Sequence, residues 1–380
     1  MVFCGIDVLE REDFESLKGR KIGLITNHTG RNLEGTSTID LLINSDACEL
    51  KALFGPEHGI RGLYDEAVQD SLDVETGLPV YSLYGVRTRP TPEQLKGIDL
   101  LVYDIQDIGT RFYTYISALG HCLEAAAEAR VSFLVLDRPN PIGGLQAEGP
   151  ITDEDSLGYT AYHPIPIRHG LSVGEMARLI VREKRLDLDL KVINAEGWVR
   201  KDWWDRTGLT WINPSPNMRS LTQASLYPGV GLLEFTNISV GRGTDTPFEV
   251  IGAPWMPGRE LAFKLNRSRL PGVRFVSILF TPRASKHEGE ECEGVNLIVT
   301  DREEFQPVLT GLKIAESLLF LTEEWWDSEK FSRLLVHNAS LERLMEGEKA
   351  EVIVEAYQTE LREFEQRTEP VKLYSSNAGY

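Results

Sequence analysis

The sequence of 380 residues has no apolar run near the length of about 18 residues that a membrane-spanning helix needs. It has only four cysteines, Cys4, Cys48, Cys122 and Cys292, and no two of them have the C-x-x-C spacing of zinc or redox motifs. We expect these thiols to be reduced and mostly buried. The first residues lack the basic and apolar regions of a signal peptide, so the sequence as given predicts a cytoplasmic protein.

Basic residues are also scarce. The 58 acidic residues outnumber the 40 basic ones, and the net charge at pH 7 is −18. Nucleic acids and anionic membranes bind positive surfaces, so we expect neither as a partner. An anionic ligand should be small and should be met by local arginines. With 42% hydrophobic residues, the chain can bury a large core and form two domains.

Several motifs of nucleotide-binding proteins and hydrolases are missing. No G-x-G-x-x-G follows the first predicted strand, and the nearest G-x-G, at residues 241–243, lacks the third glycine. There is neither a P-loop nor a G-x-S-x-G that would present a nucleophilic serine. His28, His58, His169 and Asp104 are candidate metal ligands, but none lies in an H-x-x-x-H or H-x-H pair. We predict no cofactor and no metal, and a metal-dependent hydrolase or deacetylase stays an alternative.

Short apolar runs alternate with helical spacing along the first half of the chain. We predict strands at residues 21–26, 50–54, 79–84, 100–103 and 132–136, helices at 36–45, 113–130 and 173–182, and a short helix opening at Thr91. This alternation indicates an α/β fold with a parallel sheet covered on both faces. A smaller α/β domain is predicted from helices at 259–266, 305–321, 331–345 and 349–366 and strands at 273–280 and 295–300.

Polar residues follow five of the apolar runs. These polar segments are Asn27-His28, Glu57-His58, residues 104–111, residues 137–140 and, after the run 165–167, Arg168-His169. Because the carboxyl ends of parallel strands lie along one edge of a sheet, we expect the five segments to form one site there. The second segment lies among Gly55, Gly59 and Gly62, which allow a ligand to approach the backbone closely.

The residues of this predicted site favour chemistry on sugars. Four carboxylates, Glu57, Asp104, Glu148 and Glu234, lie near turn signals, with tyrosines close to them in sequence. Glycoside hydrolysis needs a carboxylic acid that protonates the leaving oxygen and often a second carboxylate as nucleophile or base. The same residues would also suit an amino-sugar-binding protein without catalysis, so both functions stay open at this point.

Several longer motifs carry a resemblance to a known family. FGPEHGIRG from Phe54, YDIQDIGTRFYTY from Tyr103, LDRPNPIGG from Leu136, PSPNMRS from Pro214 and SVGRGTDTPFE from Ser239 together resemble the exo-β-N-acetylmuramidase family, in order over roughly residues 5–370. The resemblance implies a Rossmann-like domain, which we place at residues 1–230, and a smaller domain at 231–380 that closes a cleft. It also implies release of N-acetylmuramic acid from the non-reducing end of peptidoglycan fragments.

The resemblance places the catalytic glutamate of the family at Glu57. We predict Glu57 as the proton donor, His58 as a residue that orients it, and Glu148 as the second carboxylate, with Asp104 and Glu234 as further candidates. The lactyl carboxylate of muramic acid calls for a guanidinium group. The candidates for this role are Arg111, Arg219 and Arg242. The remaining predicted sugar contacts are Asn27, His28, Tyr113, Asn140, Asn217 and Asn237. The net charge favours small soluble fragments as substrates, and we expect a cytoplasmic enzyme of cell-wall recycling.

Overall fold

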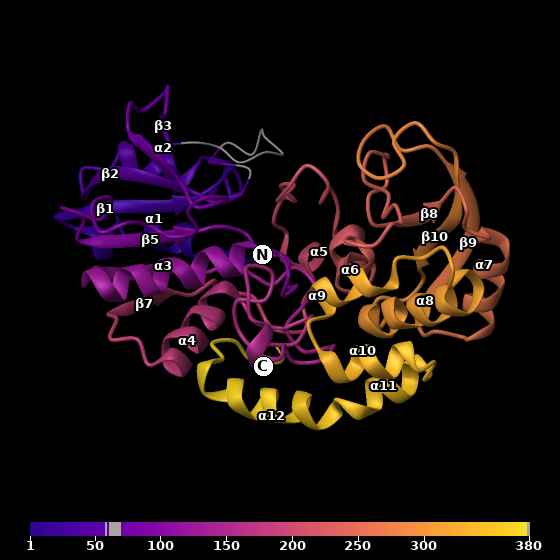
Figure 1. The fold of residues 1–380 in the computed structure, drawn as a ribbon. Coiled ribbons are helices and arrows are strands. Elements are labelled where there is room, and N and C mark those ends of the chain that lie inside the picture. Colours follow the sequence, from indigo (N-terminus) through magenta and orange to yellow (C-terminus); the bar gives the residue numbers. More distant parts are fainter. Residues whose placement is uncertain (58, 61–69, 378–380) are drawn as a thin grey trace.

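The computed structural model describes residues 1–57, 59–60 and 70–377. It has two α/β halves that lie side by side, and the consecutive helices α11 (Ala350–Ala356) and α12 (Gln358–Thr368) run below them (Figure 1). A seven-stranded sheet forms the centre of the first half, and a three-stranded sheet lies in the second half. The predicted α/β class with a large parallel sheet and a second, smaller α/β part is confirmed. The predicted boundary at residue 230 stays a prediction.

The large sheet has the strand order β3-β4-β2-β1-β5-β6-β7. Its strands are β1 (Arg20–Thr26), β2 (Cys48–Gly55), β3 (Ser71–Leu72), β4 (Pro79–Ser82), β5 (Leu100–Asp104), β6 (Ser132–Leu136) and β7 (Leu190–Ile193). All neighbours are parallel except β3 and β4. Because the chain proceeds from β1 to one side and returns with β5 on the other, the switch point of the sheet lies between these two strands.

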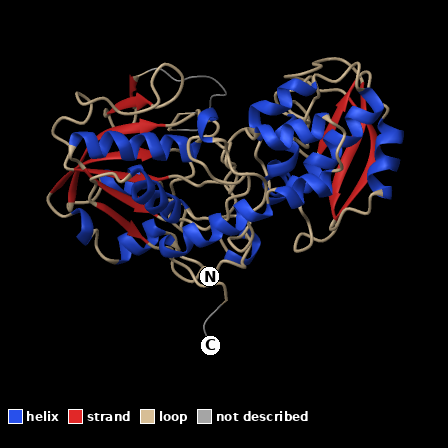
Figure 2. Ribbon diagram, turned by 60° about the horizontal axis from the view of Figure 1, so that its bottom comes forward, coloured by secondary structure: helices blue, strands red, loops and turns tan. Residues whose placement is uncertain are grey.

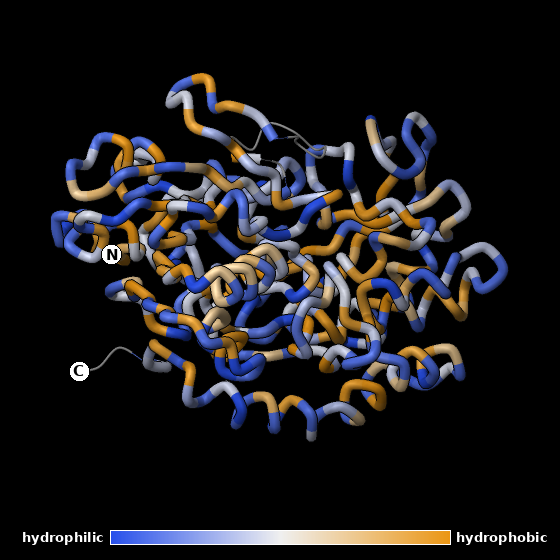
Figure 3. Tube along the Cα trace, turned by 60° about the vertical axis from the view of Figure 1, so that its left-hand side comes forward, coloured by the Kyte–Doolittle hydropathy of each residue, from blue (hydrophilic) through white to orange (hydrophobic). Residues whose placement is uncertain are grey.

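Helices cover both faces of this sheet, as predicted. Residues of α1 (Gly5–Arg11) and α2 (Thr38–Ile43) belong to one apolar cluster, and residues of α3 (Tyr115–Ala129) and α4 (Val173–Lys184) belong to another. Ser37 caps the start of α2, since its hydroxyl accepts a hydrogen bond from the Asp40 amide at 3.0 Å. The apolar stretches run through the interior, whereas the outer loops are mostly hydrophilic (Figure 3).

The second half contains an antiparallel sheet in the order β8-β10-β9. Its elements are α6 (Leu221–Val230), β8 (Val250–Ala253), α7 (Gly258–Arg267), β9 (Val273–Phe280), β10 (Cys292–Val299) and α8 (Pro307–Thr322). Helices lie beside this sheet and separate it from the first half (Figure 2). A Cβ atom on Gly229 of α6 would lie 2.0 Å from the Pro307 carbonyl oxygen of α8, so glycine permits this close helix contact.

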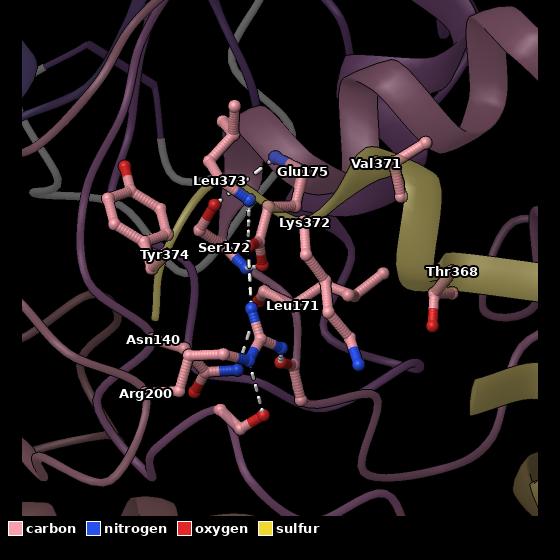
Figure 4. Close-up of polar contacts among 12 residues, drawn as sticks. Asn140, Leu171, Ser172, Glu175, Arg200, Thr368, Val371, Lys372, Leu373 and Tyr374 are labelled. Atoms are coloured by element: carbon pink, nitrogen blue, oxygen red, sulfur yellow. Dashed lines mark hydrogen bonds and ion pairs between the residues drawn. The ribbon is translucent and has the colours of Figure 1, made fainter. Parts of the chain in front are cut away.

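The C-terminal segment returns to the first half. After α9 (Ser332–Leu335), α10 (Asn338–Met345), α11 (Ala350–Ala356) and α12 (Gln358–Thr368), residues 371–375 contact the large-sheet domain. The Leu373 amide donates to Glu175 at 2.8 Å, and the Tyr374 hydroxyl donates to Asp137 at 2.5 Å. Figure 4 shows this contact, with Arg200 beside Glu175. The two halves are therefore joined at the chain end as well as at the crossing near residue 220.

Two predictions about elements are wrong, those of the short helix after Thr91 and of the two closing helices. Residues 92–97 form turns. The apolar run 165–167 forms no strand and leads into Arg168, which forms isolated β-bridges with Thr110 and Glu148. The strand that completes this side of the sheet is β7, which is only partly buried and therefore lacks a continuous apolar pattern. The two closing helices are each broken in two, the first where Val336 has a φ of 46°, in the left-handed region.

Candidate functional site

A cavity of about 530 Å³ lies between the two halves of the chain. The first half contributes residues from the ends of β2 and β4 and from the start of α3, and the second half contributes residues from the loops after α6 and β9. Its polar lining residues include Glu57, Tyr84, Tyr113, Thr114, Tyr115, Tyr159, Ser215, Asn217, Tyr227, Glu234, Arg242 and Lys286. Of the predicted site residues, this cavity brings together Glu57, Tyr113, Asn217, Glu234 and Arg242.

Glu57 lies two residues after the end of β2 and is half-buried at the cavity wall. Its carboxylate accepts a hydrogen bond of 2.7 Å from the hydroxyl of Thr114, the residue that precedes α3. The negative charge of Glu57 raises the pKa of Tyr115 and of Tyr159, although burial is the larger cause for both phenols. The carboxyl group is therefore held in place by one hydroxyl and lies among aromatic side chains.

Tyrosines form much of the cavity wall. Tyr113 packs edge-on against Tyr115 and Tyr227, with ring centroids 4.9 and 6.1 Å apart. Burial raises the pKa of Tyr113, Tyr115, Tyr159 and Tyr227 above the usual value, so these phenols stay protonated at neutral pH. Neutral hydroxyl groups beside flat apolar rings suit the hydroxyl groups and the ring faces of a sugar.

Charged groups of the second half meet around Glu234. The Glu234 carboxylate forms an ion pair of 2.7 Å with Arg242 and accepts a hydrogen bond of 3.3 Å from Tyr227. The Lys286 ammonium group donates to the backbone carbonyl of Glu234. Burial lowers the pKa of Lys286, and the Glu234 carboxylate partly opposes this shift. Two cations and one carboxylate therefore lie at this end of the cavity, which gives it a net positive charge.

The other two predicted carboxylates lie outside this cavity. Asp104 is fully buried, and both of its oxygens bind Arg138, at 2.6 and 3.0 Å. Glu148 forms an ion pair of 2.6 Å with Arg168, and its side chain is 16% exposed. Asp104 and Glu148 thus form ion pairs with the buried Arg138 and Arg168. We no longer favour Glu148 as the second catalytic carboxylate, because Glu234 lies in the same cavity as Glu57 and Glu148 does not.

Arg111 and Arg219 also lie outside the set of cavity-lining residues. Arg111 is 1% exposed and donates to four backbone carbonyls, two of them those of Leu334 and Leu335 at 2.7 Å. Its burial among carbonyl groups lowers its pKa to about 9. Arg111 therefore joins the first half of the chain to α9. Arg219 is exposed, and its guanidinium group donates to the Pro216 carbonyl at 2.8 Å.

The predicted amide and imidazole groups divide in the same way. Asn140 donates to the Leu171 carbonyl at 3.0 Å, and Asn237 donates to the Trp325 carbonyl at 2.7 Å, so both stabilise loops. Asn27 is buried next to the Tyr115 hydroxyl, and His28 Nε2 lies 2.7 Å from the Asn213 carbonyl oxygen. Asn27 and His28 therefore contact residues at or next to the cavity wall but do not line the cavity themselves. The predicted role of His58 falls outside the described residues.

Several polar residues that line this cavity are not among the predicted site residues. Thr114, Tyr227 and Lys286 lie in it, but none is part of a recognisable catalytic pattern. The sequence could have predicted Thr114, which lies in the segment TRFYTY at residues 110–115. A threonine at the start of a helix that follows a strand-end loop is well placed to contact that edge of the sheet. Lys286 had no such signal, since it lies in a loop of the second half more than 200 residues from Glu57.

No three histidine, cysteine, aspartate or glutamate side chains within residues 1–57, 59–60 and 70–377 lie close enough to hold a metal ion together. In the same part of the chain, no helix is both long and apolar enough to cross a membrane.

The fold and the cavity define a class of α/β proteins in two parts, with two carboxylates, Glu57 and Glu234, in a tyrosine-lined cavity between the parts. The family model described as "Exo-beta-N-acetylmuramidase NamZ, N-terminal" matches residues 22–222, and its C-terminal counterpart matches residues 225–374. The chain therefore belongs to the exo-β-N-acetylmuramidase NamZ family, as its motifs indicated.

Individual relatives agree with this assignment. The chain is 44% identical over 378 residues to the peptidoglycan β-N-acetylmuramidase NamZ of Bacillus subtilis strain 168. The alignment covers 98% of this chain and 91% of that protein. A crystal structure of a DUF1343 family protein from Bacteroides fragilis is 37% identical and superposes with a TM-score of 0.93, over 98% of this chain and 99% of the other. A second DUF1343 structure from the same organism is 28% identical, with a TM-score of 0.82 over 99% and 100% of the two chains.

Proposed function

We propose that this chain is an exo-β-N-acetylmuramidase, a glycoside hydrolase that releases N-acetylmuramic acid from the non-reducing end of peptidoglycan fragments. The observation that carries the proposal is the position of Glu57 and Glu234 in one cavity whose wall also holds neutral tyrosines. Two carboxyl groups around one sugar site are what glycosidases use. The relative from Bacillus subtilis, which is named for this activity, supports the choice of substrate.

In this proposal Glu57 is the general acid. Its carboxylic proton passes to the glycosidic oxygen as the bond from that oxygen to C1 breaks. Water then supplies the hydroxyl group that ends on C1, and its other proton passes to a carboxylate of the site. Thr114 holds the Glu57 carboxyl group through its hydrogen bond of 2.7 Å. Glu234 is the second carboxylate, and Arg242 and Lys286 beside it meet the lactyl carboxylate of the muramic acid ring.

The test measures release of the chromophore from para-nitrophenyl N-acetyl-β-muramide by wild type and by Glu57→Gln. We expect the wild type to act on the muramide and not on the matching N-acetylglucosaminide. The variant should lose at least about a hundredfold in kcat, because it retains the shape of the carboxyl group and not its proton. If the wild type binds N-acetylmuramic acid without cleaving the muramide, the chain is a sugar-binding protein and the proposal fails.

We further propose that the enzyme acts in the cytoplasm on imported cell-wall fragments. The net charge of −18 supports small soluble substrates, because an acidic surface is repelled by an anionic polymer. Cell fractionation of the native host, with antibodies against this chain, tests the location. Recovery of the protein in the medium or the wall fraction would contradict it.

A further inference from the structure

A second cavity lies at the switch point of the large sheet. It has a volume of about 310 Å³. Residues that follow β1, among them Thr29 and Arg31, form one side, and Gln106, which follows β5, forms another. Trp204 and Trp211 close it from the segment between α5 (Trp204–Thr207) and residue 214. In open parallel sheets, the crevice outside the strands that flank the switch point is where ligands bind.

The walls of this cavity hold polar atoms without partners. Gln106 is 5% exposed, and its amide nitrogen donates to the Asp107 and Pro139 carbonyls at 2.8 and 2.9 Å. These two bonds fix the orientation of the amide, and its oxygen has no hydrogen-bond partner among the described residues. The indole nitrogens of Trp204 and Trp211 are likewise buried without a partner in that part of the chain. Buried polar atoms are normally hydrogen-bonded, and a bound molecule would supply the partners that these three atoms lack.

Arg31 adds a cation to the same cavity. Its guanidinium group donates to the His28 carbonyl at 3.1 Å and to the Gly35 carbonyl at 2.7 Å, and it forms no ion pair with a described carboxylate. The two oxygens of the neighbouring Asp7 accept from the backbone amides of Cys4 and Leu33, each at 2.6 Å. Glu34, which also lines the cavity, is exposed. Arg138, which also lines the cavity, is paired with Asp104, so Arg31 is the cation of this lining that has no carboxylate partner among the described residues.

From these features we infer that the switch-point cavity is a second binding site, for a single amino sugar of the kind that the reaction releases. A volume of about 310 Å³ lies at the small end of ligand sites, roughly 300–1,000 Å³, and suits one pyranose rather than a chain. Indole faces pack on sugar rings, and hydroxyl groups both donate to Gln106 and accept from the indoles. The class of ligand rests on the proposed function, because it names a product of that reaction.

The second site shares a wall with the catalytic cavity. Residues 209–212 and Pro214 line the switch-point cavity, and Ser215, Asn217 and Met218 line the catalytic one. Tyr115 lines the catalytic cavity, and its hydroxyl donates to the Pro214 carbonyl at 2.5 Å. A sugar that moves this shared segment therefore changes the position of Tyr115. The released sugar would act as a regulator of turnover as well as a product.

Tryptophan resonances test the second site directly. Seven tryptophans occur in the chain, and Trp204 and Trp211 line the switch-point cavity, whereas no tryptophan is among the described residues that line the catalytic cavity. Protein labelled with ¹⁵N-tryptophan is titrated with N-acetylmuramic acid and, separately, with N-acetylglucosamine. Trp204→Phe and Trp211→Phe assign the two indole signals. We expect both signals to shift with a saturable dependence on sugar.

Two variants separate this site from the catalytic one. Arg31→Met should weaken the titration of the two indole signals about tenfold for N-acetylmuramic acid, and less for N-acetylglucosamine, which has no carboxylate. Lys286→Met, in the catalytic cavity, should leave the titration unchanged. Indole signals that stay fixed in the wild type, or that shift equally in wild type and Arg31→Met, overturn the inference. Failure of the proposed function is distinguishable, because it is seen as missing muramide turnover.

Discussion

Charged side chains in this protein serve two regions in opposite ways. The cavity charges are Glu57, Glu234, Arg242 and Lys286, and the buried charges are Asp104, Arg138, Glu175 and Arg200. The cavity charges are partly exposed and keep part of their hydrogen-bonding capacity toward the cavity. The buried charges are at most 4% exposed and are bonded to one another and to the backbone. The residue types are the same in the two regions. What distinguishes the site from the scaffold is how exposed a charged side chain is and whether all of its hydrogen bonds are already made within the protein.

The pair of Glu175 and Arg200 shows the scaffold case most clearly (Figure 4). Glu175 is fully buried and binds Arg200 at 2.6 Å, the Ser172 amide at 3.0 Å and the Leu373 amide at 2.8 Å. It thus joins α4, the loop at residue 200 and the returning C-terminal segment. No oxygen of Glu175 is left for a substrate, so a change here should affect folding before it affects catalysis.

The largest expected effect on stability comes from breaking this pair. Arg200→Met leaves the Glu175 carboxylate buried without its cation, which should lower the free energy of unfolding by about 3–5 kcal/mol. The measurement is urea unfolding followed by circular dichroism. The double variant Glu175→Met with Arg200→Met should recover part of the loss, because no lone charge remains.

The matched comparison for that variant is Lys286→Met in the catalytic cavity. Since Lys286 is only partly buried and donates to a backbone carbonyl, its loss should change the free energy of unfolding by less than about 1 kcal/mol. Equal losses for the two variants would break the distinction between scaffold and site.

A pH dependence of stability should come from Asp137, another buried scaffold residue. Burial raises its pKa from 3.8 to about 6, although Tyr374, Ser172 and the Gly174 amide donate to it. A raised folded-state pKa favours folding below about pH 4, and this contribution is lost as the pH rises through 6. At about 1.4 kcal/mol for each tenfold change in proton affinity, the loss is about 3 kcal/mol.

Asp137→Asn isolates this effect because asparagine does not titrate. From pH 4 to pH 7, the stability of wild type relative to the variant should fall by about 3 kcal/mol in urea unfolding. A difference between the two proteins that stays constant with pH would show that Asp137 has an ordinary pKa in the fold.

The sequence predicted where polar residues gather but not which of them face a ligand. Glu57, Asp104 and Asn140 all follow buried strands, so the same rule selected them. Glu57 has its oxygens at the cavity, whereas Asp104 is paired with Arg138 and Asn140 is bonded to the Leu171 carbonyl. These partners come from distant parts of the chain, and a local pattern holds no information about them.

The fold was easier to predict than the site for a related reason. Short apolar runs such as β5 and β6 are buried in the core, so the run of apolar residues by itself predicts a buried strand. Strand β7 was missed because three of its four residues are exposed or partly exposed. Lys286 was missed because the cavity forms only when the second half packs on the first.

The smaller of the two predicted effects on catalysis concerns substrate specificity and depends on Lys286. If the ammonium group meets the lactyl carboxylate, Lys286→Met should raise KM for the muramide about tenfold, which corresponds to about 1.4 kcal/mol, and leave kcat nearly unchanged. Arg242 cannot fully replace it, because its guanidinium group is already paired with Glu234 at 2.7 Å. Steady-state kinetics on para-nitrophenyl N-acetyl-β-muramide give both constants.

The control for this prediction is Lys264→Met. Lys264 lies over the Phe320 ring at 3.9 Å, on a surface of the second half away from the cavity-lining residues, and its loss removes the same charge. If both variants raise KM equally, the effect comes from net charge and not from a contact in the cavity. If only Lys286→Met does so, and its affinity for N-acetylglucosamine is unchanged, the cavity distinguishes the two sugars by the carboxylate. The two lysines then differ in function because only Lys286 lines the cavity.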